Sequence, residues 1–203
     1  MIKSSKYYLI IALFIIFNTN LSMALEEPAY KIIKSYEGYE IRKYDDRLAV
    51  EVEFRSEDSG FNYLFNYISG ENTTSEKISM TVPVTQSAKI DMTAPVTQSN
   101  KDGKMLMQFF LPSKFTIDTA PTPKNKRVKL VIIEGGYYAV LKYSGRNSDK
   151  NYLNRLSELK DYLEKDKIVM LDNGTKATFD GPFTLPILRR NEAMIKINYN
   201  GSS

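Results

Sequence analysis

Hydrophobic and polar residues alternate along most of the chain, a pattern that predicts short β-strands. The alternation is clearest at Leu48–Phe54, where every second residue is apolar and Glu51 and Glu53 fall on the opposite face. Similar but weaker or more apolar patterns predict strands at residues 30–35, 39–44, 105–111, 127–134, 137–143, 177–179 and 192–197. The sequence therefore predicts a sheet-rich chain, with the proline-containing range 112–126 as a connector.

Two segments instead repeat apolar residues at the spacing of an amphipathic helix. The first stripe consists of Phe61, Leu64, Phe65 and Ile68. The second stripe consists of Tyr152, Leu156, Leu159 and Leu163. Ser59 and Ser148 are the expected N-caps, and Gly70 is expected to end the first helix. Because strands, helix and strands occur twice in this order, we predict an α+β domain with an internal duplication and two helices packed on curved antiparallel sheets.

The N-terminal residues 1–24 have the pattern of a secretory signal peptide. Lys3 and Lys6 precede an apolar run at residues 7–17, which is shorter than the roughly 20 residues of a membrane span. Small residues at Ser22 and Ala24 predict cleavage after Ala24. We therefore expect an exported protein, periplasmic or secreted, with a single domain over residues 25–203 and no membrane span after cleavage. An uncleaved N-terminal anchor is the alternative.

The composition limits the catalytic and metal-binding sites that the protein can form, because the chain contains no histidine and no cysteine. This excludes Ser-His-Asp and Cys-His catalysis, zinc fingers and iron–sulfur clusters. We expect no catalytic residues, no enzymatic activity and no structural metal. The formal charge is +4, and residues 1–24 contribute two lysines and no acid, so the rest is nearly neutral. We therefore expect no nucleic-acid partner, and we expect a monomer.

A short repeat lies between the first predicted helix and the strand at residues 105–111. KISMTVPVTQSA at residues 77–88 is followed directly by KIDMTAPVTQSN at residues 89–100, with nine of twelve positions identical. Proline keeps the residue before it extended and removes a ladder donor, so each MTxPVT segment is predicted to be extended at a sheet edge or a bulge. Two interpretations remain open: hairpin strands that line a core, or methionines that line an adaptable apolar cleft.

These residues resemble the K-I-x-M-T-x-P-V signature of the SOUL haem-binding protein family. Three further blocks are similar to the same family, in order and at compatible spacing. They are GFNYLFNY at residues 60–67, FLP followed by PTP and RVKLVIIE within residues 110–134, and DGPF through RRNE within residues 180–192. The resemblance runs from about residue 30 to residue 197.

The resemblance implies a distorted antiparallel β-barrel of two similar halves, each with one flanking helix, and binding of haem or another tetrapyrrole. By position, the implied apolar cleft is lined by Phe61, Leu64, Phe65, Ile68, Met80 and Val82. Lys77 and Arg42 are then candidate partners for the propionates at an exposed mouth. Since the chain has no histidine, the tetrapyrrole is expected to be held by apolar contact, or its iron to be ligated by Met or by Tyr63 or Tyr67.

Other interpretations stay open. The Arg189–Glu192 block favours a buried salt-bridge network, in which Glu192 pairs with an arginine across the fold, over an anion site. A general apolar small-molecule binder with no haem role is the main functional alternative, because fold does not fix the ligand. A hydrolase that works without histidine is a more remote alternative, and the sequence contains no GxSxG motif.

Overall fold

The computed structural model describes residues 26–55, 57–73, 94–101, 104–181 and 183–200. In chain order the elements are β1 (Tyr30–Ser35), β2 (Glu40–Tyr44), β3 (Arg47–Phe54), α2 (Glu57–Ile68), β4 (Asn72–Thr73), β5 (Val96–Lys101), β6 (Lys104–Phe110), β7 (Thr122–Pro123), β8 (Lys129–Ile133), β9 (Gly136–Tyr143), α3 (Asp149–Lys165), β10 (Val169–Met170), β11 (Thr175–Thr178), a 3₁₀ turn (Pro186–Leu188) and β12 (Asn191–Asn198). Each strand predicted from the alternation is confirmed within a few residues, and so is the α+β class.

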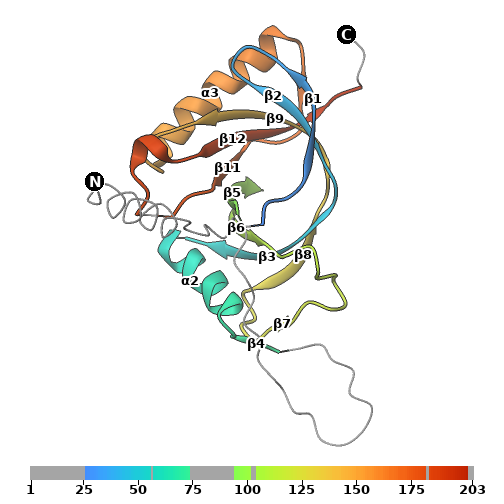
Figure 1. Ribbon diagram of the computed structural model, residues 1–203, viewed down its shortest axis with the longest axis vertical. Helices are drawn as coiled ribbons and strands as arrows, with labels where there is room; N and C mark the ends of the chain where they lie inside the picture. The colour runs from blue at the N-terminus through green and yellow to red at the C-terminus, as the bar shows by residue number, and fades with distance from the viewer. Residues whose placement is uncertain (1–25, 56, 74–93, 102–103, 182, 201–203) are drawn as a thin grey trace, which may run out of the picture.

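One large antiparallel sheet forms the body of the molecule, in the strand order β1-β2-β9-β12-β11-β5-β6-β3-β8, with β10 added beside β12. The sheet curls strongly, as Figure 1 shows. The expectation of a barrel is corrected here: β1 and β8 are the two end strands, and no ladder joins them among the described residues. The strand–helix–strand order recurs in both halves, while the internal duplication itself stays a prediction.

The two helices cover the outer side of the curled sheet at its two ends (Figure 1). α2 packs on β3 and β6, and α3 packs on β9 and β12. Each helix closes a separate hydrophobic core against its part of the sheet. The position of each helix thus follows from its apolar stripe, which must be buried against a neighbouring layer.

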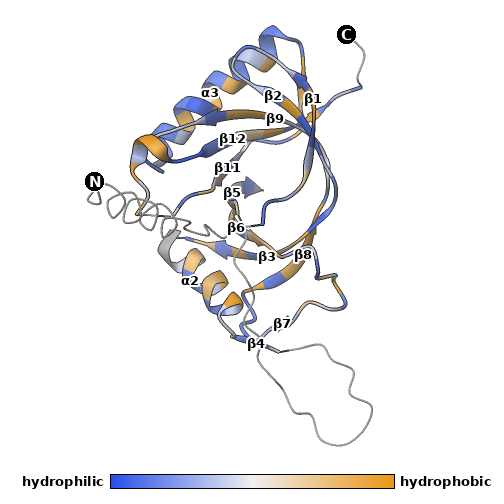
Figure 2. Ribbon diagram, in the orientation of Figure 1, coloured by the Kyte–Doolittle hydropathy of each residue, from blue (hydrophilic) through white to orange (hydrophobic). Residues whose placement is uncertain are grey.

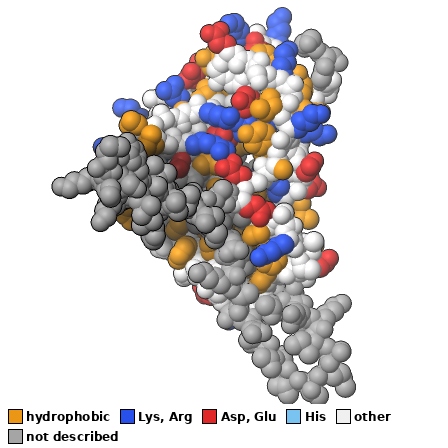
Figure 3. All heavy atoms as spheres, viewed as in Figure 1, with side chains coloured by type: hydrophobic (Ala, Val, Ile, Leu, Met, Phe, Trp, Pro, Cys, Tyr) orange, Lys and Arg blue, Asp and Glu red, His pale blue; other side chains and the backbone are white. Residues whose placement is uncertain are grey.

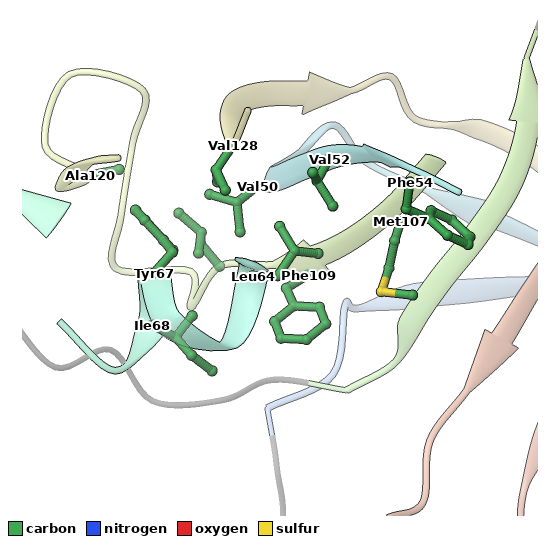
Figure 4. Close-up of a cluster of buried hydrophobic side chains, with 11 residues drawn as sticks. Val50, Val52, Phe54, Leu64, Tyr67, Ile68, Met107, Phe109, Ala120 and Val128 are labelled. Carbon is green, nitrogen blue, oxygen red and sulfur yellow. The ribbon is translucent and has the colours of Figure 1, made fainter. Parts of the chain in front are cut away.

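The core beneath α2 joins the helix to β3 and β6. Leu64 and Tyr67 are essentially inaccessible and lie against Val50 and Phe109 (Figure 4). Gly60 lies so close to the sheet that a Cβ atom there would be 3.0 Å from the Phe54 side chain. α2 therefore packs closely on the sheet along Gly60, Leu64 and the residues one turn further on.

The core beneath α3 has the composition that its stripe predicts. Leu156, Leu159 and Leu163 are buried against residues of β2, β9 and β12. A third cluster, of Tyr44, Tyr138, Val140, Ala177 and Met194, lies apart from the cores beneath the two helices. Strand residues therefore pack on both faces of the curled sheet.

The helix ends test the capping predictions. Ser59 is not an N-cap, because α2 begins at Glu57 and Ser59 lies inside its first turn. Gly70 ends α2 as predicted: its φ is 120°, and its N–H donates to the Tyr67 carbonyl while the N–H of Glu71 donates to that of Asn66. Ser148 caps α3, and its side chain accepts a hydrogen bond from the N–H of Asn151.

The described end of the MTxPVT repeat lies inside the sheet. Pro95 directly precedes β5, where its missing N–H breaks no ladder bond, and Val96 and Thr97 begin the strand. The prediction of an edge position is wrong for this part, because β5 pairs with β11 on one side and β6 on the other. The signal peptide and residues 77–93 of the repeat lie outside the described residues. No helix in the described part of the chain is long and apolar enough to cross a membrane.

Candidate functional site

The predicted stripe on α2 divides into a buried part and an exposed part. Leu64 and Ile68 are buried in the core, with 0% and 5% of their surfaces exposed. Phe61 and Phe65 are 36% and 45% exposed. Their rings stack, with centroids 5.8 Å apart and an angle of 14° between the planes. Of the four predicted lining residues on this helix, two therefore anchor it and two present an aromatic surface.

The exposed rings rest on the core beneath α2, where Phe109 of β6 is 2% exposed. The ring of Phe61 meets that of Phe109 edge to face, with centroids 5.3 Å apart. Phe109 pairs with Val96, the first residue of β5. The described end of the second MTxPV segment thus enters the sheet next to Phe109, the ring that Phe61 touches. We call the exposed rings of Phe61 and Phe65 the aromatic face of α2.

The two tyrosines of α2 lie away from this face. The Tyr67 hydroxyl is buried and donates to the Pro121 carbonyl at 2.8 Å, and burial raises the pKa of Tyr67. Tyr67 therefore belongs to the core, which makes it unsuited to the iron-ligand role that the resemblance suggests. Tyr63 is half-buried on the opposite flank of α2, and its hydroxyl oxygen accepts from Nη1 of Arg127 at 2.8 Å.

Arg42 does not lie at an exposed mouth, which corrects the expectation for it. Its side chain is 0% exposed and donates to both carboxylate oxygens of Glu192 at 3.0 and 3.2 Å. It also bonds Glu40 and the Tyr44 hydroxyl, and it lies over the Tyr30 ring. Burial opposes its charge, but Glu192 and Tyr44 outweigh burial and raise the pKa of Arg42. All of its polar nitrogens are engaged within the fold, which leaves little capacity for a propionate.

The Arg189–Glu192 block completes this network, as the salt-bridge interpretation predicts. Glu192 is fully buried and accepts from Arg190 at 3.3 Å as well as from Arg42. Arg190 reaches in turn to both carboxylate oxygens of Glu27, at 3.0 and 2.8 Å. A buried carboxylate between two guanidinium groups costs little only because all its partners are in place. This block therefore has an architectural role.

The remaining predicted site residues, Lys77, Met80 and Val82, lie outside the described residues. Among the described residues, no group of three or more carboxylate-bearing side chains could hold a metal ion. On the face shown in Figure 3, basic and acidic side chains are interspersed, so that face carries no extended patch of one sign.

Three hollows lie among the described residues; Tyr63 lines one of them, and none is lined by Phe61, Phe65 or Arg42. A cavity of about 50 Å³ lies inside the curl of the sheet, far below the roughly 300–1,000 Å³ of pockets for larger ligands. An open groove of about 360 Å³ adjoins it. A second groove, of about 730 Å³, runs past Tyr63 and is lined mostly by charged side chains: Glu51, Glu53, Arg55, Lys104, Arg127 and Lys129. The cavity is too small for a tetrapyrrole, and the larger groove is lined mostly by charged side chains.

Comparison with known proteins agrees with this architecture. A family model described as SOUL heme-binding protein matches residues 25–196. No curated protein matches the sequence.

Solved structures share the fold at low identity. A hydrolase from Listeria innocua is 12% identical, with a TM-score of 0.52 over 81% of this chain and 94% of that chain. The EcmrR C-terminal domain is 10% identical, with a TM-score of 0.53 over 83% and 98%. An uncharacterized conserved protein from Listeria innocua is 11% identical, with a TM-score of 0.50 over 91% and 98%. At such identities these likenesses show the α+β fold alone.

Proposed function

Because the chain belongs to the SOUL heme-binding protein family, we propose that it binds a tetrapyrrole, haem or porphyrin, on the aromatic face of α2. The observation that carries the proposal is the stacked pair of exposed rings, Phe61 and Phe65, next to Phe109. Near-parallel phenyl rings offer a flat apolar surface on which a macrocycle can stack. Met80, Val82 and Lys77 follow α2 in the sequence and are proposed to complete the site.

The described residues are better suited to stack against the tetrapyrrole macrocycle than to ligate its iron. Tyrosine ligates ferric iron as the phenolate, and burial disfavours the phenolate of Tyr67 while its hydroxyl is bonded to Pro121. Tyr63 lies on the flank of α2 opposite to Phe61, so it cannot reach iron on the aromatic face. We therefore infer that apolar contact supplies the affinity, and that the protein barely distinguishes haem from metal-free porphyrin.

We further propose that the protein is a binding protein without enzymatic activity. The absence of histidine and cysteine from the whole sequence supports this, since both common nucleophile–base pairs need one of them. Two of the similar structures are described as hydrolases, but likeness at 12% identity concerns the fold. A chromogenic ester assay decides the matter: turnover that scales with enzyme concentration would overturn the proposal.

Export and oligomeric state belong to the same proposal. The family match begins at residue 25, which leaves the apolar N-terminal residues 1–24 outside the family domain. We propose that these residues direct export, that cleavage follows Ala24, and that the mature protein is a monomer without a nucleic-acid partner. Intact-mass measurement of the exported protein should give a chain that starts at Leu25, whereas a mass that includes residues 1–24 would indicate a retained anchor.

A Soret titration without a polyhistidine tag tests the binding proposal, because a tag would supply iron ligands that the chain lacks. Haemin and metal-free protoporphyrin are titrated in parallel. The proposal expects saturable binding of both, with dissociation constants within about threefold of each other, since stacking contact does not involve the metal.

Two outcomes would overturn parts of the proposal. Binding of neither ligand would remove the tetrapyrrole function and favour a general apolar-ligand binder on this fold. A strong preference for haemin that disappears in Tyr63→Phe would place the iron instead in the charged groove beside Arg127. Phe61→Ser should leave that preference unchanged in such a case, which separates the two sites.

A further inference from the structure

Arg47, the first residue of β3, is a half-buried cation that has no acidic partner among the described residues. Its guanidinium lies between two rings, 4.5 Å from the centroid of Tyr44 and 4.3 Å from that of Phe110. Its Nε atom is buried and has no hydrogen-bond partner among the described residues. Burial lowers the pKa of Arg47, and only the hydroxyls of Tyr138 and Tyr44 act in the other direction. A charge held in this way is costly unless a further group compensates it.

The guanidinium lines the cavity of about 50 Å³ inside the curled sheet. Since a cavity needs about 10–15 Å³ to hold one water, this volume accommodates a few heavy atoms, such as a carboxylate group. Aromatic and polar side chains form the rest of the wall, among them Tyr30, Tyr44, Thr97, Gln108, Phe110 and Tyr138. Tyr44 accepts a hydrogen bond from Arg42, and its own O–H has no acceptor among the described residues. The cavity therefore offers at least two directed donors.

The other charges at the cavity neutralise one another. Arg190 pairs with Glu27, and Glu192 pairs with both Arg42 and Arg190. No acidic side chain of the described residues lies within salt-bridge distance of Arg47. Of the charged side chains that line the cavity, Glu27, Arg190 and Glu192 thus belong to one ion-pair network, and Arg47 is the one without an ion-pair partner among the described residues. A single negative charge on a ligand would supply that partner.

An open groove of about 360 Å³ leads to the same guanidinium and shares Arg47 and Phe110 with the cavity. The carboxylates of Glu26, Asp45 and Asp46 line this groove. Their charge repels ligands that carry several negative charges, because partly screened carboxylates still act over a few ångströms. The surroundings therefore favour an anion with one charge and an otherwise neutral, apolar body.

We propose that Arg47 binds the carboxylate of a small aromatic monocarboxylic acid, whose ring extends over Phe110 into the groove. A planar guanidinium matches a carboxylate with two parallel hydrogen bonds, and the two flanking rings fix its orientation before the ligand arrives. This site is separate from the aromatic face of α2, on the inner side of the sheet, and does not depend on tetrapyrrole binding.

Benzoate is the probe, and calorimetric titration into the full chain is the measurement. Benzamide, which has the same shape without charge, and benzylammonium, which has the opposite charge, are titrated in parallel. We expect saturable binding of benzoate, with both other compounds at least about tenfold weaker, corresponding to the loss of one charge-assisted pair. Equal binding of benzamide, or preference for benzylammonium through Glu27 and Glu192, would overturn the proposal.

Two variants localise the effect. Arg47→Gln should weaken benzoate binding at least about tenfold, whereas Arg127→Gln, which removes a guanidinium stacked on Tyr63 outside the cavity, should leave it unchanged. Because Arg47 has no acidic partner among the described residues, Arg47→Gln breaks no ion pair there and loses only the two ring contacts, so it should still fold. If it fails to fold, Arg47→Lys keeps the charge but removes the planar pair of donors, and it should still lose most of the affinity. Unchanged binding in a folded Arg47 variant contradicts the proposal.

Discussion

The two helices occupy comparable positions at the two ends of the curled sheet, but their outward surfaces differ. α3 buries Leu156, Leu159 and Leu163, and its remaining surface is largely hydrophilic (Figure 2). α2 buries Leu64 and Ile68 equally well, yet it is mostly apolar or neutral in the same view and exposes Phe61 and Phe65. Both helices cover the sheet, and only α2 keeps a second apolar flank in solvent.

This difference distinguishes a helix that only packs on the sheet from one whose outer surface can also bind a ligand. A helix that only covers a sheet needs a single apolar stripe, which α3 has. A single exposed apolar residue is ordinary, and Leu153 on α3 is an example, with 56% of its surface exposed. The two stacked exposed rings of Phe61 and Phe65 form a continuous aromatic surface that rests on the buried ring of Phe109, and exposed apolar patches are typical of interaction sites. The predictions below test this comparison in order of decreasing effect.

The largest effects should come from the buried faces, where the two helices are expected to behave alike. Leu64→Ala and Leu159→Ala each remove a side chain that is 0% exposed and leave a cavity in a separate core. Each should lower the free energy of unfolding by about 2–5 kcal/mol. Urea denaturation measures this. A loss below about 1 kcal/mol for Leu64→Ala alone would mean that α2 is not held to the sheet as described.

The exposed faces should differ sharply in binding. The double variant Phe61→Ser, Phe65→Ser should weaken protoporphyrin binding at least about tenfold, or about 1.4 kcal/mol, because it removes the stacking surface. Leu153→Ser, the matched change on α3, should bind as the parent does. Protoporphyrin fluorescence measures the affinities.

Stability must be followed in the same proteins, because Phe61 also touches Phe109 and such a contact contributes about 0.5–1.5 kcal/mol. Phe65→Ser alone leaves that contact in place and should still weaken binding. Equal affinity of the double variant and the Leu153 variant, both folded by circular dichroism, would refute the difference between the helices.

A smaller effect is expected at the start of α3. Ser148→Ala removes the side chain that accepts from the N–H of Asn151, and should lower the free energy of unfolding by about 1 kcal/mol. Porphyrin binding should not change, since α3 has only a structural role in this account. Denaturation and titration of the same variant check both points, and a parallel loss of affinity would show that the helices are coupled.

The smallest effect is expected on the opposite flank of α2. Arg127→Gln breaks the 2.8 Å hydrogen bond to Tyr63 and a cation–π contact at an exposed site, which together contribute about 1 kcal/mol or less. Protoporphyrin affinity should stay within about twofold of the parent. A tenfold loss would move the tetrapyrrole from the aromatic face into the charged groove.

The sequence predicts local elements well because local periodicity determines them. The strands, both helices, the Gly70 end and the Ser148 cap all follow from residues a few positions apart. The open sheet could not be predicted, since closure depends on whether β1 and β8 meet. The Ser59 cap fails because α2 begins almost one turn earlier than that cap requires, at Glu57.

The candidate site could be predicted only in part, because local periodicity does not determine how the elements pack on one another. The stripe identifies Phe61, Leu64, Phe65 and Ile68, but only the packing of α2 decides which two stay exposed. Arg42 and Arg47 show the limit most clearly, because each lies on an ordinary-looking strand. Arg42 meets Glu192, which is 150 positions away in the sequence, while Arg47 meets no acid among the described residues. The order of strands in the sheet, which brings β2 and β12 to either side of β9, is not readable from local periodicity.

The most direct test of the central claim is to locate haemin on the folded protein by NMR. Ferric haemin broadens amide signals near its iron, and metal-free protoporphyrin is the diamagnetic reference. The account predicts selective broadening at Phe61 and Phe65, with the signals around Leu153 on α3 unaffected. Broadening centred on α3, on the Arg127 flank of α2 or on the cavity beside Arg47, or no selective broadening at saturating haemin, would contradict it.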